Sequence, residues 1–178
     1  MRIALIIAAF GLPWLPGVRG PASSGVTPAW VYNVSFATAT SNIQNDPAYT
    51  WGAVVTANQT GSCTKVAGGF ASSGSGYNIK AGLFDMSLVP LGSGTAGTTS
   101  GTSVDMEVTL ASPVSVTSGT SYIVLYAVDS ASAGYSAYIN PITNQGRIDF
   151  SNGYSTFPLN PATTGINDYQ FRVGMYIQ

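Results

Sequence analysis

The residues best placed for chemistry are two neighbouring carboxylates, Asp105 and Glu107, in the segment "SVDMEVTL". On a β-strand, residues i and i+2 point to the same side about 7 Å apart, within the separations that paired acids occupy in glycosidases. The segment places Val104, Met106 and Val108 on the opposite side, which is typical of a strand with one buried and one solvated face. We therefore expect the two acids to lie on a wet surface and to be non-catalytic.

Residue types restrict the other catalytic and metal-binding arrangements. The sequence has no histidine, which excludes a Ser-His-Asp or Cys-His catalytic arrangement and any His-ligated metal. Cys63 is the sole cysteine, and we expect a small buried apolar residue there, with an interchain disulfide as the alternative. Asp129 or Asp149 would offer oxygen to calcium, but no ligand spacing surrounds them. The sequence thus predicts no catalytic residue, no metal site and no cofactor, and favours a protein that is not an enzyme.

Aromatic side chains are stronger candidates for a binding site. Exposed rings offer flat apolar faces on which a sugar ring packs, while Asn, Gln and Asp side chains hydrogen-bond at its edge. Aromatic residues of a β-sandwich more often fill the core, as we expect for Trp51 and Tyr122. The segment from Tyr135 to Phe157 has loop-like sequence and is the main candidate to line a carbohydrate site. The candidate residues are Trp30, Tyr135, Tyr138, Tyr154 and Phe157.

Charged residues are scarce. They make up 7% of the 178 residues and leave a net charge of −1, against about 25% charged residues in an ordinary soluble domain. Six scattered Lys and Arg side chains cannot neutralise a phosphate track, so nucleic acid and anionic membranes are poor partners. The surface must consist of Ser, Thr, Asn, Gln and Gly, and weak repulsion between copies favours self-association. We expect a homo-oligomer.

The first twenty residues, "MRIALIIAAFGLPWLPGVRG", carry an apolar run followed by prolines. The run is too short to span a membrane, and no other apolar run reaches the 18 residues that a spanning helix needs. Two interpretations stay open: a cleaved secretory signal, with an exit near residues 20–22, or an arm that docks into a neighbouring subunit. The arm is favoured because the signal would have one basic side chain and prolines crowding its cleavage site. Residues 1–29 then form the arm and its Pro/Gly linker, anchored by Ile3, Leu5, Ile6, Ile7, Phe10, Leu12, Trp14 and Leu15.

Period-two alternation dominates the rest of the chain, which predicts β-strands. The segment 169–178, "YQFRVGMYIQ", places Phe171, Val173 and Met175 on one face and Arg172 on the other, and the segment 122–128 is apolar on both faces. The low-complexity stretch 92–103 reads as a flexible loop. We expect an all-β fold, an antiparallel jelly-roll-like β-sandwich of nine or ten strands over residues 30–178. The expected strands are 30–36, 49–57, 64–71, 77–85, 88–92, 103–110, 122–128, 135–140, 147–151 and 169–178.

The order "IKAGLFDMSLVPLGSGTA" followed by "VDMEVTLASPVSVTSGTSYIVLYAV" resembles jelly-roll modules of phage tail or appendage proteins and of secreted bacterial carbohydrate-binding-like proteins. The resemblance covers about residues 49–128. It implies that Pro113 ends a strand, that Gly119 takes positive φ in a tight turn and that Tyr122 opens a central strand. The matching positions are Leu83, Phe84, Asp85, Leu110, Pro113, Val114, Val116, Gly119, Thr120 and Tyr122.

Two functions of different class follow. The first is a non-enzymatic structural subunit of a phage virion, a tail fibre, appendage or head decoration. Such a subunit would be oligomeric, with a trimer favoured, docked to other virion proteins by its arm and in contact with host polysaccharide. The second is a secreted extracellular module that binds carbohydrate through exposed aromatic rings after loss of a signal peptide. Modules of this kind have both functions, so the resemblance alone does not choose between them.

Overall fold

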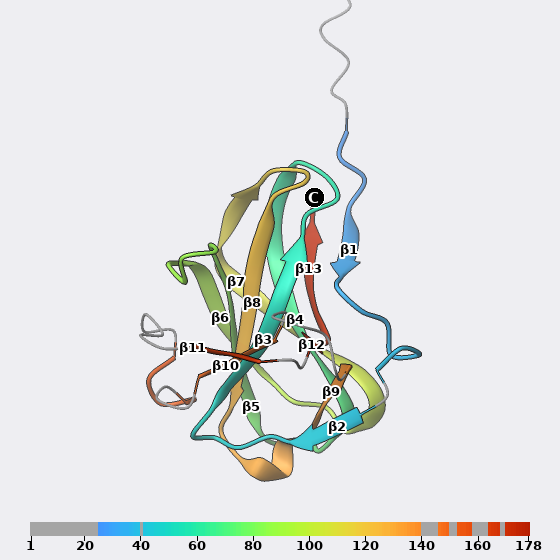
Figure 1. Ribbon diagram of the computed structural model, residues 1–178, viewed down its shortest axis with the longest axis vertical. Helices are drawn as coiled ribbons and strands as arrows, with labels where there is room; N and C mark the ends of the chain where they lie inside the picture. The colour runs from blue at the N-terminus through green and yellow to red at the C-terminus, as the bar shows by residue number, and fades with distance from the viewer. Residues whose placement is uncertain (1–24, 40, 140–145, 150–152, 158–163, 168–169) are drawn as a thin grey trace, which may run out of the picture.

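Two antiparallel β-sheets pack face to face and enclose the hydrophobic core (Figure 1). The computed structural model describes residues 25–39, 41–139, 146–149, 153–157, 164–167 and 170–178. Within these residues there are thirteen strands, one 3₁₀ turn (η1, Ala131–Ala133) and no α-helix. The strands are β1 (Ala29–Tyr32), β2 (Ser41–Gln44), β3 (Thr50–Thr56), β4 (Gly61–Ser73), β5 (Asn78–Phe84), β6 (Pro90–Gly97), β7 (Gly101–Val116), β8 (Ser121–Val128), β9 (Gly134–Ile139), β10 (Gly146–Asp149), β11 (Thr164–Asn167), β12 (Gln170–Phe171) and β13 (Val173–Ile177).

The first sheet has the order β1-β13-β4-β9-β12, and β7 pairs with β4 while β2 pairs with β9. β7 pairs with β4 along its whole length. The opposite edge of β4 pairs first with β13 and then with β9. The second sheet has the order β11-β10-β3-β8-β5-β6. The all-β antiparallel sandwich predicted from the sequence is confirmed. The strand number is higher than expected because β2, β11 and β12 are too short, at two to four residues, to show a readable alternation.

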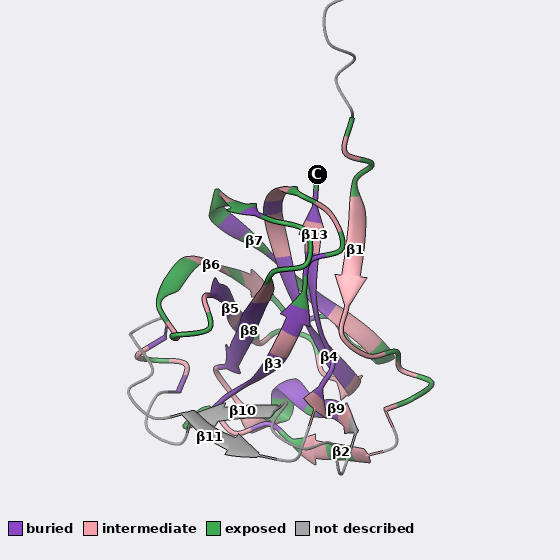
Figure 2. Ribbon diagram, turned by 45° about the horizontal axis from the view of Figure 1, so that its top comes forward, coloured by how far each residue is buried: buried purple, intermediate pink, exposed green. Residues whose placement is uncertain are grey.

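The alternating residues meet between the sheets as predicted. Met106, Val108 and Leu110 of β7 are buried, and so are the inward residues of β12 and β13, whereas Tyr169 lies outside the described residues. The apolar segment 122–128 is buried along its whole length, as the colour of β8 in Figure 2 shows. Both faces of the strand are covered because a second hydrophobic cluster forms on its outer side. Cys63 is fully buried, as expected, and burial raises the pKa of its thiol to about 12.

The expected flexible loop at 92–103 is wrong, because most of it forms β6 and the start of β7. β6 is the edge strand of the second sheet, and it pairs with β5 while lying close against β7 of the first sheet. A Cβ on Gly94 would lie 2.0 Å from the carbonyl oxygen of Thr109 in β7. The glycines that made the segment look unstructured instead allow two backbones to approach at the edge of the sandwich.

Two other strand boundaries differ from the prediction. β7 continues through Pro113, because the ladder jumps from Lys65↔Thr109 to Cys63↔Val114 and leaves 110–113 opposite one residue of β4. Proline fits there since a bulged residue needs no backbone N–H for the ladder. The C-terminal segment is interrupted at Arg172, which separates β12 from β13.

The turn features implied by the family resemblance are present. Gly119 has φ +80° in the turn between β7 and β8, and Thr120 N–H donates to the Thr117 carbonyl at 3.0 Å. Tyr122 follows at the start of β8, and its hydroxyl accepts the Thr117 N–H at 3.1 Å. The resemblance did not specify the turn between β5 and β6, where the Asp85 carboxylate accepts the N–H groups of Ser87 and Val89, each at 2.9 Å.

Replacement of Gly94 by Ala tests the close approach of β6 and β7. Because the added Cβ would collide with backbone, we expect Gly94→Ala to lower the free energy of unfolding by about 1–3 kcal/mol, measured by urea denaturation. Gly97→Ala is the matched control in the same strand, since its Cβ would meet only the Tyr77 carbonyl oxygen at 3.9 Å. The control should change stability by less than about 0.5 kcal/mol. Equal effects of the two substitutions would contradict the close approach.

Candidate functional site

A buried arginine joins the N-terminal segment to the outer face of the first sheet. Phe171 and Val173 point into the core, so Arg172 between them points outward. Its backbone carbonyl accepts the Gly69 N–H at 2.9 Å, and a Cβ on Gly69 would lie 2.6 Å from the arginine Cδ. Glycine at this position of β4 therefore leaves the space in which the arginine side chain lies along the sheet.

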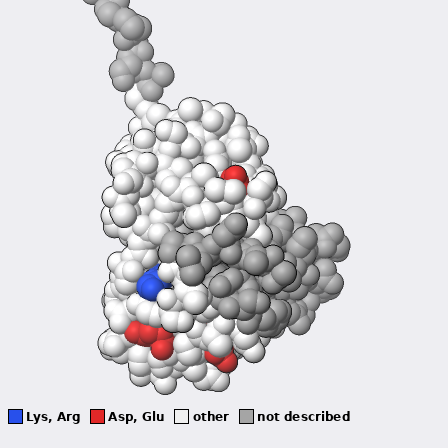
Figure 3. Space-filling model, turned by 90° about the vertical axis from the view of Figure 1, so that its left-hand side faces the viewer, with Lys and Arg blue, Asp and Glu red and all other residues white. Residues whose placement is uncertain are grey.

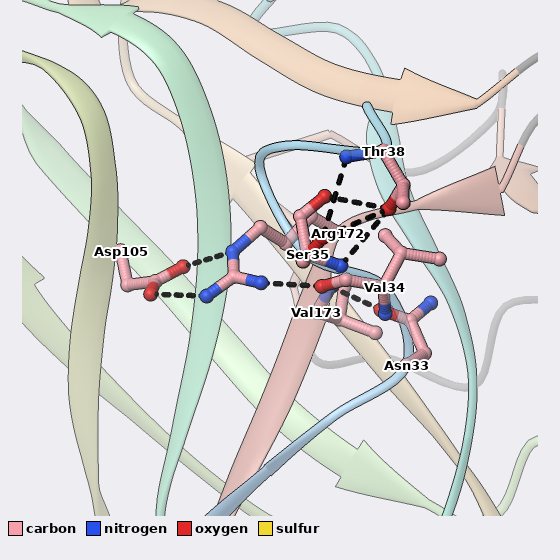
Figure 4. Close-up of polar contacts among 7 residues, drawn as sticks. All are labelled: Asn33, Val34, Ser35, Thr38, Asp105, Arg172 and Val173. Atoms are coloured by element: carbon pink, nitrogen blue, oxygen red, sulfur yellow. Dashed lines mark hydrogen bonds and ion pairs between the residues drawn. The ribbon is translucent and has the colours of Figure 1, made fainter. Parts of the chain in front are cut away.

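All three branches of the Arg172 guanidinium are engaged (Figure 4). Its Nε donates to Asp105 Oδ1 at 2.8 Å and its Nη2 donates to Asp105 Oδ2 at 2.7 Å. The Nη1 donates to the backbone carbonyl of Val34 in the segment after β1. The two side chains are only 9% and 19% exposed. This two-pronged geometry is the strongest form of an arginine–carboxylate pair, and it ties β7, the β12–β13 junction and the N-terminal segment together.

Two aromatic rings pack against the guanidinium. The arginine Cζ lies 3.9 Å from the centroid of the Tyr32 ring and 4.2 Å from that of Phe36. The Tyr32 ring in turn stacks on Trp30, with centroids 5.4 Å apart and planes at 19°. Cation–π contacts of this kind strengthen when water is excluded. We call Arg172, Asp105, Tyr32, Phe36 and the Val34 carbonyl the Arg172 clamp.

The surroundings of Tyr32 disfavour the ionised form of its hydroxyl. Burial raises the pKa of its hydroxyl, and the nearby Asp105 carboxylate raises it further by charge and by a hydrogen bond, while the positive charge of Arg172 acts in the opposite direction. The phenol therefore remains protonated throughout the neutral range. A neutral hydroxyl can donate to the carboxylate, so the tyrosine adds to the same network as the arginine.

Asn33 completes the attachment of the N-terminal segment. Its Oδ1 accepts the Val173 N–H at 2.9 Å, and its Nδ2 donates to the Phe171 carbonyl at 2.7 Å. The amide thus satisfies the backbone on both sides of the interruption at Arg172. The triplet "NVS" at residues 33–35 matches a glycosylation acceptor, but the Nδ2 that would carry a glycan is occupied by this contact.

The predicted acid pair occupies one strand face, but each carboxylate has a different partner. Asp105 binds Arg172, whereas Glu107 binds Lys65, with Nζ and Oε2 3.1 Å apart. The Lys65–Glu107 pair is 41% and 45% exposed. The expected wet face is therefore right for Glu107 and wrong for Asp105, because the segment after β1 covers the latter.

The five aromatic candidates lie in different places. Trp30 is half-buried beside Tyr176, with ring centroids 5.5 Å apart, and Tyr135 is 41% exposed on β9. Tyr138 packs against Phe171 in the core, with centroids 5.7 Å apart. Only Trp30 belongs to an aromatic group on the outer face of the first sheet. The structure does not bring the candidates together into one surface.

The segment 153–157 covers the outer face of the second sheet and carries the other two aromatic candidates. Phe157 is buried, with its ring centroid 6.0 Å from that of Phe84. Lys80 of β5 donates to the Tyr154 carbonyl at 2.9 Å, and its Nζ lies 4.5 Å from the centroid of the Tyr154 ring. The rest of the segment predicted to line a sugar site, between 139 and 153, lies largely outside the described residues.

The two aspartates considered as calcium ligands, Asp129 and Asp149, are the remaining candidates from the sequence. The Asp129 carboxylate accepts both the backbone N–H and the side-chain amide of Asn78, at 2.9 and 2.7 Å. The side chain of Asp149 is outside the description. Among the described residues no three His, Cys, Asp or Glu side chains gather into a metal-binding group, and no pocket opens between these residues.

The eight apolar arm residues, Ile3, Leu5, Ile6, Ile7, Phe10, Leu12, Trp14 and Leu15, lie outside the described residues. Across the described part of the chain, no helix has the length and apolar character needed to cross a membrane. Sequence reasoning missed Arg172 as a site residue. The one available signal was a basic residue embedded in the apolar run "QFRVGM", whose partners are distant in sequence.

Comparison of the chain with protein-family models and with curated protein sequences gives no match.

Double-mutant cycles on the two ion pairs of this sheet face test the clamp. Removal of Asp105 alone leaves a buried guanidinium without its counter-charge, so we expect Asp105→Ala to lower the free energy of unfolding by about 3 kcal/mol. The coupling energy between Asp105→Ala and Arg172→Ala should be about 1.5–3 kcal/mol. The exposed pair, Lys65→Ala with Glu107→Ala, serves as control and should couple by less than about 1 kcal/mol. Equal coupling energies in urea denaturation would contradict a special role of the clamp.

Proposed function

We propose that this chain is a non-enzymatic structural subunit of a phage virion, a tail fibre, appendage or head decoration. The subunit is a homo-oligomer, with a trimer favoured, and docks to its neighbours through its apolar N-terminal arm. The observation that carries the proposal is the Arg172 clamp. It fixes the segment 29–39 to the sandwich, so that a pull on the arm would be borne by the sheet through β1 and the buried ion pair.

The rest of the surface supports an assembly role. Few charged side chains interrupt the uncharged surface of the face shown in Figure 3 over its described part, so copies repel one another weakly. The two neighbouring carboxylates of β7 are each neutralised by a basic side chain rather than poised for acid–base work. The family resemblance over residues 49–128 also points to virion appendages.

A secreted carbohydrate-binding module is the second candidate. The half-buried Trp30 beside Tyr32 and Tyr176 favours it, because it is an aromatic group on an outer sheet face. Two ring faces in that group are already taken, one by the arginine and one by stacking, so the exposed area for a sugar is small. The virion subunit is therefore our first choice.

Light scattering on the purified full-length chain tests the proposal. We expect an oligomer, and we expect Ile7→Asp with Phe10→Asp to convert it to a monomer because a charged arm cannot be buried in a neighbour. Thr117→Asp, which adds charge at an exposed position of the sandwich, is the control and should leave the mass unchanged. Mass spectrometry of the mature chain should find residues 2–20 intact. A stable monomer that lacks these residues and binds glycans would contradict the proposal and favour the secreted module.

A further inference from the structure

The connection between β5 and β6 and the start of β6 display three exposed apolar side chains. Met86 is 51% exposed, Val89 48% and Leu91 40%, and among the described residues only one other large apolar side chain, Tyr135, is comparably exposed. The three residues lie within six positions of the sequence. We call them the hairpin patch.

The hairpin patch is held in place by its own turn. Asp85 accepts three N–H bonds: its backbone carbonyl takes that of Leu88 at 3.0 Å, and its carboxylate takes those of Ser87 and Val89. Leu88 has φ +65°, which a leucine rarely adopts. Its side chain packs inward against the cluster around Phe84. Leu88 therefore anchors the turn to the core from a strained backbone position. The residues of the hairpin patch stay exposed on a turn whose backbone is fixed by hydrogen bonds.

The hairpin patch lies at the end of the sandwich where the N-terminal segment leaves. β8 pairs Ser121 with Thr56 and Ile123 with Phe84, so the connection after Phe84 and the turn after Thr56 share one end. In that turn Gln59 donates to the carbonyl of Thr27 at 3.0 Å. The described chain thus begins beside the same end that carries the patch.

The chemistry of the patch matches one segment of this chain. Residues 3–15 contain no charged side chain and are rich in Ile, Leu and aromatic residues. The connection from β5 to β6 lies on the left of Figure 1, and the face seen from that side carries few charges over its described part (Figure 3). The ten residue-to-residue steps from 15 to 25 reach at most about 35 Å when extended. That length suffices to bridge to a copy packed alongside.

We propose that the hairpin patch, Met86, Val89 and Leu91, is the docking surface for the apolar N-terminal segment, residues 3–15, of a neighbouring copy. The inference rests on the proposed function, since it specifies where the docking arm binds. Burial of the three side chains under the arm supplies the hydrophobic driving force for association. In a ring of copies, each sandwich receives the arm of one neighbour and gives its own to the next.

Photo-crosslinking on the full-length chain tests the docking surface. The photoreactive residue p-benzoylphenylalanine replaces Val89 in one sample and Thr117 in a control, since Thr117 is exposed at the same end. Mixed ¹⁴N- and ¹⁵N-labelled chains allow mass spectrometry to separate crosslinks between copies from those within one copy. We expect the Val89 probe to join residues 3–15 of a different copy at least tenfold more than the Thr117 probe does. Crosslinks within one copy, to the sandwich of another copy, or to no protein segment would each overturn the proposal.

A pair of charge substitutions separates this inference from the proposed function. Val89→Asp should raise the dissociation constant of the oligomer at least tenfold, whereas Ser87→Asp, at an exposed polar position of the same turn, should not. Circular dichroism and thermal unfolding check that both variants fold. If the arm substitutions dissociate the oligomer but Val89→Asp does not, the docking surface is wrong and the proposed function stands. If the full-length chain is a monomer, the proposed function itself fails.

Discussion

The ion pair between Arg172 and Asp105 is the constraint on which the attachment of the N-terminal segment depends. An arginine side chain that is 9% exposed is stable only when its donors are satisfied and its charge is compensated. Here the carboxylate, the Val34 carbonyl and two ring faces meet that demand together. These partners come from β7, from β1 and from the segment after β1, whereas Arg172 itself lies at the β12–β13 junction. The charge can therefore be satisfied only when all of these parts are in place.

A basic side chain packed against an aromatic ring also holds a segment to the other face of the sandwich. Lys80 holds the segment 153–157 against the second sheet through the ring and carbonyl of Tyr154. Lys65 lies 5.8 Å from the ring centroid of Tyr176 on the first sheet. Thus each of the three basic side chains that the structure describes lies near an aromatic ring. The few charges of the described surface are thus used to hold the chain's own segments together, which agrees with the self-association proposed above.

Local patterns predicted most of the sandwich, and long-range contacts account for what they missed. Alternation identified the buried faces of β7 and β13, and the motif position Gly119 marked a real turn. The glycine-rich segment 92–103 was misread because its glycines serve a backbone approach to β7, which no local pattern encodes. Arg172 was missed for the same reason: its partner Asp105 is 67 positions away. The scattering of the aromatic candidates likewise depends on which strands become neighbours.

Hydrogen exchange in the Arg172→Lys variant tests the central claim most directly. Lysine keeps the positive charge but can neither form the two-pronged bond to Asp105 nor stack as a flat group between two rings. Exchange is followed by mass spectrometry in peptides covering residues 29–39 and, as an internal reference, the central strand β8. We expect at least tenfold faster exchange in 29–39, with β8 unchanged. Unaltered protection of residues 29–39 in this variant would contradict the central claim.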